Sequence, residues 1–301
     1  MTVAVSEADA SVVNVTALRR STTSEVDVCC EVKLPVKYDV EAALQAQGRV
    51  EVQGLQNARV RIATEEGGAA VNRLQSLQVI YRTSSGPLLV KGKLLSSLQA
   101  SATRVLSISG DMIQGGSVEV NAPKIECNLQ SLHLNSLQLA ADDVTLRVND
   151  VTCHTSSIQA EHAHVLIGNY SGGMTWQFSS MSLEVAVPRL HGDSSVVATR
   201  GRVSLGCPTE YRYGICVTGQ DVCMHREFKE VKCIAADIKD AAGDMKDAAG
   251  DMKDAAGDMK DAAGDKGRQR VLAGPSSPLL SVTLLEGRCS LVPWTWPRTR
   301  H

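Results

Sequence analysis

The stretch Ser117–Cys153, SVEVNAPKIECNLQSLHLNSLQLAADDVTLRVNDVTC, decides the fold. Its apolar residues occupy alternate positions in short bursts, and the phase of the alternation slips by a residue or two between bursts. The bursts are Val118 and Val120; Ile125, Cys127 and Leu129; Leu132 and Leu134; Leu137 and Leu139; and Val144, Leu146 and Val148. Alternation is typical of a strand with one buried face. Bursts this short predict strands that turn corners, each turn of the chain stacking on the last.

The same pattern extends over most of the chain. Between residues 27 and 224, a short strand and a glycine turn alternate roughly every ten residues, the spacing of an all-β chain. Examples of the predicted strands are Val50–Val52, Val60–Ile62 and Leu77–Tyr81. Glu41–Gln47 has helical propensity but is short, and no helix of ten residues or more is predicted in this region. That excludes βαβ folds, which need a crossover helix between parallel strands.

The amino-acid composition limits which residues can form the core and which classes of partner the chain favours. The chain is 43% hydrophobic but only 3% aromatic. We therefore expect a core of Val, Leu, Ile and Ala, which suits a narrow coiled interior. The formal net charge of −2 gives no whole-chain bias toward nucleic acid or an anionic membrane.

Cysteine usage and the first residues bear on the compartment. The opening sequence MTVAVSEADASVVNVTALRRSTTSE lacks a basic region followed by a long apolar core, so no secretory signal is predicted. No run of about 18 apolar residues occurs, so no membrane-spanning helix is predicted. The nine cysteines are odd in number and scattered, which favours reduced core thiols over a disulfide framework. These features predict an intracellular protein, cytoplasmic or mitochondrial.

The chain divides into four predicted parts. Residues 1–25 are polar and expected to be disordered, apart from one strand at Val12–Val15. Residues 26–224 form the predicted coiled β-region. Residues 225–275 form an insertion. Residues 276–297 return to strand phase, with Leu280, Val282 and Leu284 followed by a turn at Gly287.

The insertion contains a tandem heptad, IKDAAGDMKDAAGDMKDAAGDMKDAAGD, at residues 238–265. Its Ile or Met and its Ala recur at spacings that resemble the a and d positions of a coiled coil. Each heptad also carries a glycine, which costs a helix about 1 kcal/mol relative to alanine. Residues 239–265 hold four lysines and eight aspartates, and the aspartates fall on one helical stripe, where they repel one another. We predict an exposed, fluctuating helix or disorder, with a role as an acidic docking tail as one alternative.

Two regions resemble a known family. Residues 190–222, LHGDSSVVATRGRVSLGCPTEYRYGICVTGQDV, resemble the terminal coils of the adhesin-like β-solenoid domain family, whose function is uncharacterised. The shared features are Gly192, Val196-Val197, the Gly201 turn, Val203, Leu205, Pro208 and the segment 215–219. Residues 30–67 resemble the amino-terminal coils of its eukaryotic branch, and Trp294 and Trp296 resemble a terminal Trp of that branch. The resemblance implies a single right-handed parallel β-solenoid, all-β in class, and supplies no catalytic residue.

One group of residues was weighed as a metal site. Cys207, Cys216, Cys223, His225 and Cys233 lie close in sequence, but their spacings form none of the paired knuckles typical of zinc sites. We therefore favour thiols without a metal.

His162 and His164 share a strand face, beyond Cys153 and His154, and could chelate an ion. We favour solvent-facing strand histidines.

The sequence signals for a catalytic site are weaker than those for a metal site. Cys153 and His154 are adjacent, and neighbours on a strand point to opposite faces. Asp142-Asp143 precedes a strand, where a turn role is favoured over a carboxylate pair. No phosphate-binding loop or dinucleotide fingerprint occurs. We predict no catalytic, cofactor-binding or metal-binding residue.

Two functional hypotheses remain. The first is a non-enzymatic scaffold or binding protein that uses its long strand faces to contact a protein partner. The alternative is a β-solenoid carbohydrate-active enzyme, of lyase or glycoside hydrolase type, which needs two or more acids converging in one cleft.

Overall fold

The computed structural model describes residues 2–9, 12–18, 39–44, 48–56, 59–208, 213–225, 232–235, 269–273 and 278–293. Within these residues there is no helix, and the strands β3 to β14 belong to one large sheet in which most neighbours are parallel. The all-β prediction is therefore confirmed for the described part of the chain. The heptads at 238–265, residues 26–38 and both Trp294 and Trp296 lie outside it.

The chain divides into two compact units, Met1–Pro35 and Val36–His301. In the first unit, β1 (Thr2–Asp9) pairs antiparallel with β2 (Val12–Leu18). β2 includes the strand predicted at Val12–Val15.

The second unit begins with three short strands. These are β3 (Val40–Leu44), β4 (Arg49–Gln53) and β5 (Arg59–Thr64). β3 covers the first part of the segment whose composition favours a helix, and its parallel pairing with β5 overrides that propensity.

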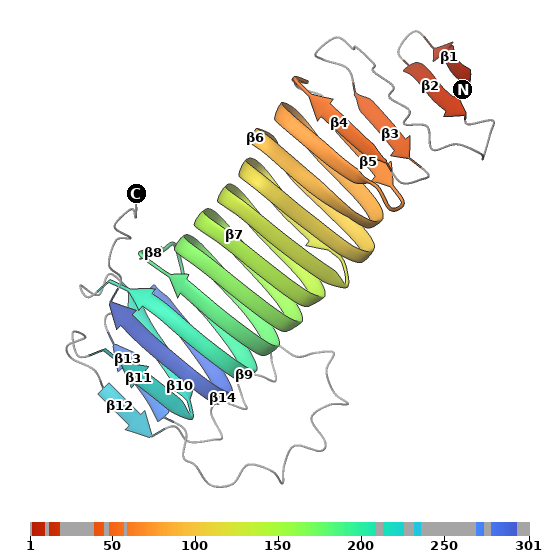
Figure 1. Cartoon of the computed structure of the whole chain (residues 1–301). Helices are drawn as coiled ribbons and strands as arrows, with labels where there is room; N and C mark the ends of the chain where they lie inside the picture. Colours follow the sequence, from red (N-terminus) through yellow and green to blue (C-terminus); the bar gives the residue numbers. More distant parts are fainter. Residues whose placement is uncertain are drawn as a thin grey trace, which may run out of the picture. The chain divides into compact units, whose positions relative to one another are not determined.

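Two long strands follow, β6 (Gly68–Asn121) and β7 (Lys124–Ala186). They are long because the ladder of backbone hydrogen bonds continues around the corners, so that the ribbon winds coil upon coil (Figure 1). Val105 pairs with Lys124, and Thr175 pairs with Ser195, each with the position that follows one full pass of the chain. One such pass, as from Val105 to Lys124, is called a coil below.

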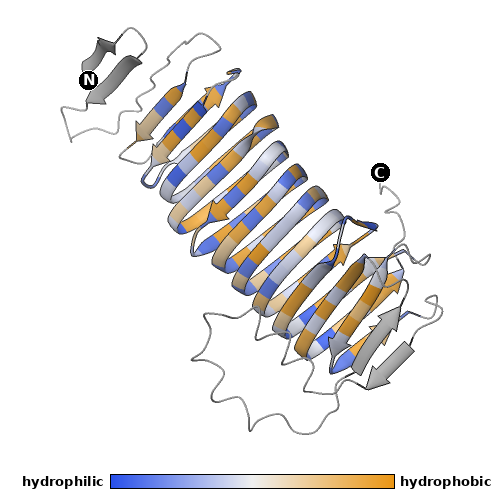
Figure 2. Cartoon of the chain, turned by 180° about the vertical axis from the view of Figure 1, so that it is seen from behind, coloured by the Kyte–Doolittle hydropathy of each residue, from blue (hydrophilic) through white to orange (hydrophobic). Residues whose placement is uncertain are grey.

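The alternation of apolar and polar residues in the sequence matches the alternation of buried and exposed residues in the structure. All apolar residues of the bursts in Ser117–Cys153 are buried, and Cys127, at 7%, is the most exposed of them. Bands of apolar and polar residues accordingly alternate along the ribbon (Figure 2). Burying one such aliphatic side chain contributes about 1.5–3 kcal/mol, so the interior is the main source of stability.

Two details of the core differ from expectation. Leu77 is 61% exposed, although Val79 and Tyr81 on the same predicted phase are fully buried. The phase slips there because a corner intervenes. The interior also contains aromatic side chains, and Trp176 and Tyr170 are both fully buried against each other, edge to face.

The last coils do not stack in chain order. After β8 (Arg189–Leu190) and β9 (Ser194–Cys207) the chain forms β10 (Gly214–Gly219) and β11 (Asp221–Met224). The later strand β14 (Leu279–Pro293) lies between them and β9, parallel to both sides. At the far edge, β13 (Gln269–Ala273) pairs antiparallel with β10, and β12 (Lys232–Ala235) pairs antiparallel with β13. β14 lies within the range 276–297 where terminal strands were expected.

Candidate binding surface

One outward face of the coils combines charged side chains of both signs. The register places 182–186, 202–206, 288–292 and 221–223 on neighbouring strands. Steps of one coil length, 19 or 20 residues, extend the same outward positions back through 162–166 and 143–147 to 124–128. The charged residues of this mixed-charge face are Lys124, Arg147, Arg202, Arg288, Glu126, Asp143, Glu184 and Asp221. The four positive and four negative side chains balance, so this face lacks the positive excess that a nucleic-acid surface requires.

Four of the charges on the mixed-charge face form two local pairs. Lys124 Nζ lies 2.7 Å from Glu126 Oε1 on the same strand, and Glu126 raises the pKa of the Lys124 ammonium. Arg288 Nε lies 3.7 Å from Asp221 Oδ2 on the next strand. Exposed pairs of this kind contribute little to stability, because water screens the charges. Because positive and negative charges are equal in number, this polar face produces little net electrostatic field.

A leucine stands among these charges. Leu166 is 39% exposed and lies two residues beyond His164, on the outward side of the same strand. Large apolar side chains surrounded by a polar rim are typical anchors of protein interfaces. The sequence had not singled out Leu166, because apolar residues on both sides of it belong to the interior.

The histidines lie outside the core, as predicted. His162 and His164 flank the buried Ala163 and are both exposed on the mixed-charge face. His154 instead faces His191 from another coil, with ring centroids 6.1 Å apart. Sequence reasoning missed this pair because its members are distant in the sequence, and only the coil spacing brings them together.

The cysteines considered as zinc ligands differ in their surroundings. Cys207 and Cys216 are buried, whereas Cys223 is half-buried, with its Sγ 3.2 Å from Arg288 Nη2. The backbone N–H of His225 donates to Leu291 O. Across the residues that the structure describes, no three His, Cys, Asp or Glu side chains gather as metal ligands. The side chain of Cys233 lies outside the described set.

Most of the described cysteines are buried. Five of the six are buried and none forms a disulfide with another described cysteine. Burial raises the pKa of Cys127, Cys207 and Cys289 to about 12 and that of Cys153 to about 11. These thiols are therefore protonated at neutral pH, which makes them poor nucleophiles and poor metal ligands.

The adjacent Cys153 and His154 point in opposite directions, as the strand geometry predicts. Cys153 is fully buried and its thiol lies 2.7 Å from Thr155 O, whereas His154 is exposed. The imidazole therefore does not face the thiol, and the two do not form a nucleophile and base pair.

Several acidic side chains hold the backbone of a neighbouring coil. Asp39, Asp111 and Asp193 accept hydrogen bonds from the backbone N–H groups of Arg59, Gly92 and Leu279, at 2.7, 2.7 and 2.9 Å. Carboxylates used in this way are structural. The backbone N–H groups of Asp142 and Asp143 both donate to Pro123 O of the preceding coil, and both residues lie within β7, so the predicted turn role of this pair stays a prediction.

A buried hydroxyl cluster stabilises one corner of the coils. Ser156 Oγ accepts a hydrogen bond from Trp176 Nε1 at 2.8 Å and lies 2.6 Å from Tyr170 Oη. Tyr170 Oη also donates to Gly173 O at 2.6 Å, and burial raises the pKa of this phenol above its usual value. Isolated Ser and Tyr positions gave no signal for this cluster, because its members come from successive coils.

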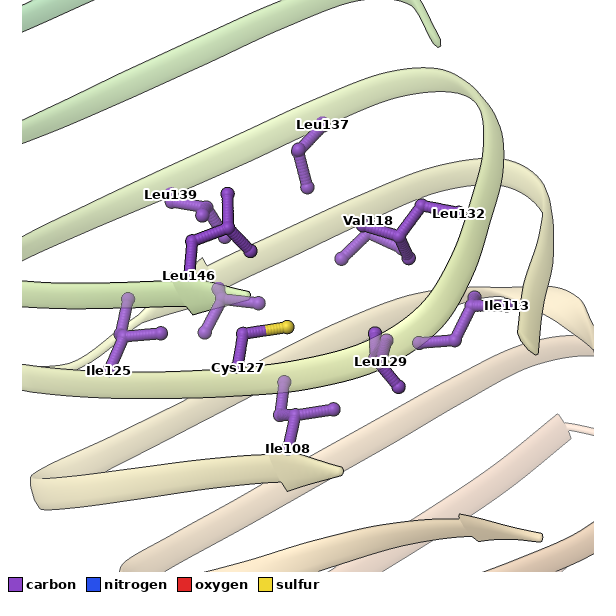
Figure 3. Close-up of a pocket in the computed structure, with 11 residues that line it drawn as sticks. Ile108, Ile113, Val118, Ile125, Cys127, Leu129, Leu132, Leu137, Leu139 and Leu146 are labelled. Carbon is purple, nitrogen blue, oxygen red and sulfur yellow. The ribbon is translucent and has the colours of Figure 1, made fainter. Parts of the chain in front are cut away.

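The interior contains a cavity of about 10 Å³, shown in Figure 3 with its aliphatic lining pointing inward. That volume is close to the smallest that holds one water molecule, and the cavity offers no polar partner for it. The lining residues are Ile108, Ile113, Val118, Val120, Ile125, Cys127, Leu129, Leu132, Leu137, Leu139 and Leu146. The coils around this cavity are packed too closely to admit a ligand there.

Comparison with known proteins gives no assignment. No family model matches this chain, and no solved structure matches it. The resemblance to the adhesin-like family accordingly stays a prediction from the residues quoted above. In the part of the chain with described coordinates, no helix has the length and apolar character needed to cross a bilayer.

Proposed function

We propose that this protein is a non-enzymatic scaffold or binding protein, built as a right-handed parallel β-solenoid of the adhesin-like kind. The proposed partner is a protein that docks on the mixed-charge face. The observation that carries the proposal is this face itself: outward charges of both signs, spaced by about one coil length, around the exposed Leu166. Stacked repeats of this type present extended surfaces to partners.

The chemistry of the acids supports binding over catalysis. A glycosidase or lyase needs free carboxylates converging in a cleft. Asp111 and Asp193 instead hold backbone N–H groups, and Glu126 and Asp221 pair with basic side chains. No specific observation favours the enzyme, so a polysaccharide activity is the outcome that would oppose the proposal.

The proposed site of action is inside the cell. Five buried thiols without a disulfide among the described cysteines support a reducing compartment. The acidic heptads at 238–265 are a second place where a partner could dock, and deleting them separates that contribution from the strand face.

The test uses two exposed leucines as a matched pair. Leu166→Glu changes the mixed-charge face, and Leu77→Glu changes an exposed leucine on another part of the coils. The tagged full-length chain and both variants are compared by proximity labelling in the native cell. We expect Leu166→Glu to lose neighbours that Leu77→Glu retains, because a carboxylate replaces the apolar anchor.

Identical neighbours for the two variants would overturn the proposed face. Cleavage of polysaccharides by the purified chain, reduced by substituting an acidic residue, would overturn the non-enzymatic proposal. A crystal structure in which the strands form two face-packed antiparallel sheets would overturn the solenoid.

A further inference from the structure

The C-terminal strand β14 fills a slot between two strands that precede it in the chain. Leu280 pairs with Ser194 of β9 on one side and with Ile215 of β10 on the other. We propose that β14 is exchanged between two copies of this chain. In the resulting dimer, each copy's slot between β9 and β10–β11 holds the β14 strand of the other copy.

The strands on the two sides of β14, β9 and β10–β11, are spaced in the sequence like adjacent coils. They therefore form the slot without any contribution from β14. Ser194 and Ile215 are the two partners of Leu280, and Arg202 and Asp221 are the two partners of Arg288. Each pair of partners is separated in the sequence by about one coil. Elsewhere in the sheet, positions at that separation pair directly with each other. β14 is therefore a strand added between two consecutive coils.

Every copy of β14 fits this slot because the strand repeats the pattern of its neighbour. Val282, Gly287 and Leu291 lie beside Val196, Gly201 and Leu205. The inward side chains of β14 are at most 1% exposed: Leu280, Val282, Leu284, Cys289 and Leu291. A strand from a second copy would make the same contacts, so exchange loses none of this burial.

The connection to β14 favours exchange. β13 ends at Ala273 beside Ile215 on one side of β10, and Leu280 lies beside the same residue on the other side. Only five residues, 274–278, separate β13 from β14 in the sequence, and the two strands run in opposite directions on opposite sides of β10. Short hinges under such constraint favour swapping, because an opened hinge can pass directly to a second copy.

The test places one cysteine on each side of the β9–β14 pair. Val197→Cys and Thr283→Cys change half-buried residues that lie opposite each other on adjacent strands. The two full-length single variants are mixed, refolded together at several chain concentrations and treated with a short bismaleimide. We expect a covalent heterodimer whose yield rises with chain concentration. Glu286→Cys replaces Thr283→Cys in the control pair, because residue 286 lies opposite Arg200.

The double variant Val197→Cys/Thr283→Cys reports the same contact within one chain. If it links internally while the mixed single variants give no heterodimer above the control pair, exchange is excluded. If it does not link at all, the β9–β14 pairing fails, and the proposal with it. Native mass spectrometry of the unsubstituted chain supplies a readout without added cysteines, and we expect dimer at high chain concentration.

The hinge supplies a second arm. Inserting Gly-Ser-Gly-Ser between Ser276 and Ser277 relieves the constraint on closure within one chain, and we expect a severalfold lower yield of dimer. An unchanged yield would remove the hinge argument on which the exchange depends.

Discussion

The middle coils and the C-terminal coils of the second unit are built by the same rules but assembled differently. Between residues 105 and 140 the stacking order is the chain order, and the interior is almost entirely aliphatic. From residue 194 onward a later strand separates two earlier coils, and Cys207, Cys289 and Tyr213 enter the interior. The difference teaches that alternation of apolar residues specifies a coil but does not specify its neighbour.

The largest expected effect tests a glycine corner of the C-terminal coils. Gly287 has φ of 116°, and a Cβ there would overlap Gly201 O. Gly287→Val should lower the free energy of unfolding by about 4 kcal/mol or more, from backbone strain and steric overlap together. Denaturant unfolding measures this, and limited proteolysis should cut the C-terminal coils first. Gly192→Val is the control, because a Cβ at Gly192 meets open space. Equal effects at both glycines would contradict the corner geometry.

The second prediction compares the two interiors. Leu132→Ala in the middle coils should cost about 2–5 kcal/mol, because it leaves a cavity beside the one already present. Leu284→Ala in β14 should fall in the same range if the inserted strand is packed as closely as its neighbours. The exposed Gln138→Ala should stay within about 0.5 kcal/mol of the unsubstituted chain. A cost below about 1 kcal/mol at Leu284 would show that the C-terminal coils are loosely packed.

The third prediction is a pH dependence shared by both regions. Thiols of the unfolded chain ionise near pH 8.5, whereas burial raises the pKa of Cys127 and Cys289 to about 12. The unfolded state therefore loses protons first. The contribution to stability is complete below about pH 8.5 and is lost as pH rises toward 12, by about 1.4 kcal/mol per pH unit for each thiol.

Urea unfolding of the reduced chain between pH 8 and 11 measures this slope. Cys127→Ala and Cys289→Ala should each remove the share of one thiol, one in each region. A slope that neither substitution changes would contradict the burial of these thiols.

The sequence predicted the coils better than their order. The alternating bursts from Val118 to Val148 are buried as expected, because a strand with one inward face needs only local pattern to specify it. The position of β14 between β9 and β10 could not be derived in this way, since the alternation around Leu280 fits any neighbouring coil. Long-range pairing depends on which edges are available, and no local signal records that.

The candidate surface, too, could be predicted only where local sequence pattern decides it. His162 and His164 were correctly assigned to one outward face from their two-residue spacing. The partners Arg288 and Asp221, and the pair His154 and His191, come from different coils, so their proximity required the register of the sheet.

The position of β14 has a consequence for biosynthesis. β11 ends at Met224 and β14 begins only at Leu279, so the ribosome has released β10 and β11 well before their lasting neighbour exists. At about 5–20 residues per second, this interval is roughly 3–11 s. During it the nascent chain exposes the sheet edge of β9, or covers it with a provisional stack that must later reopen. Chaperones that shield strand edges would act on this protein at that moment.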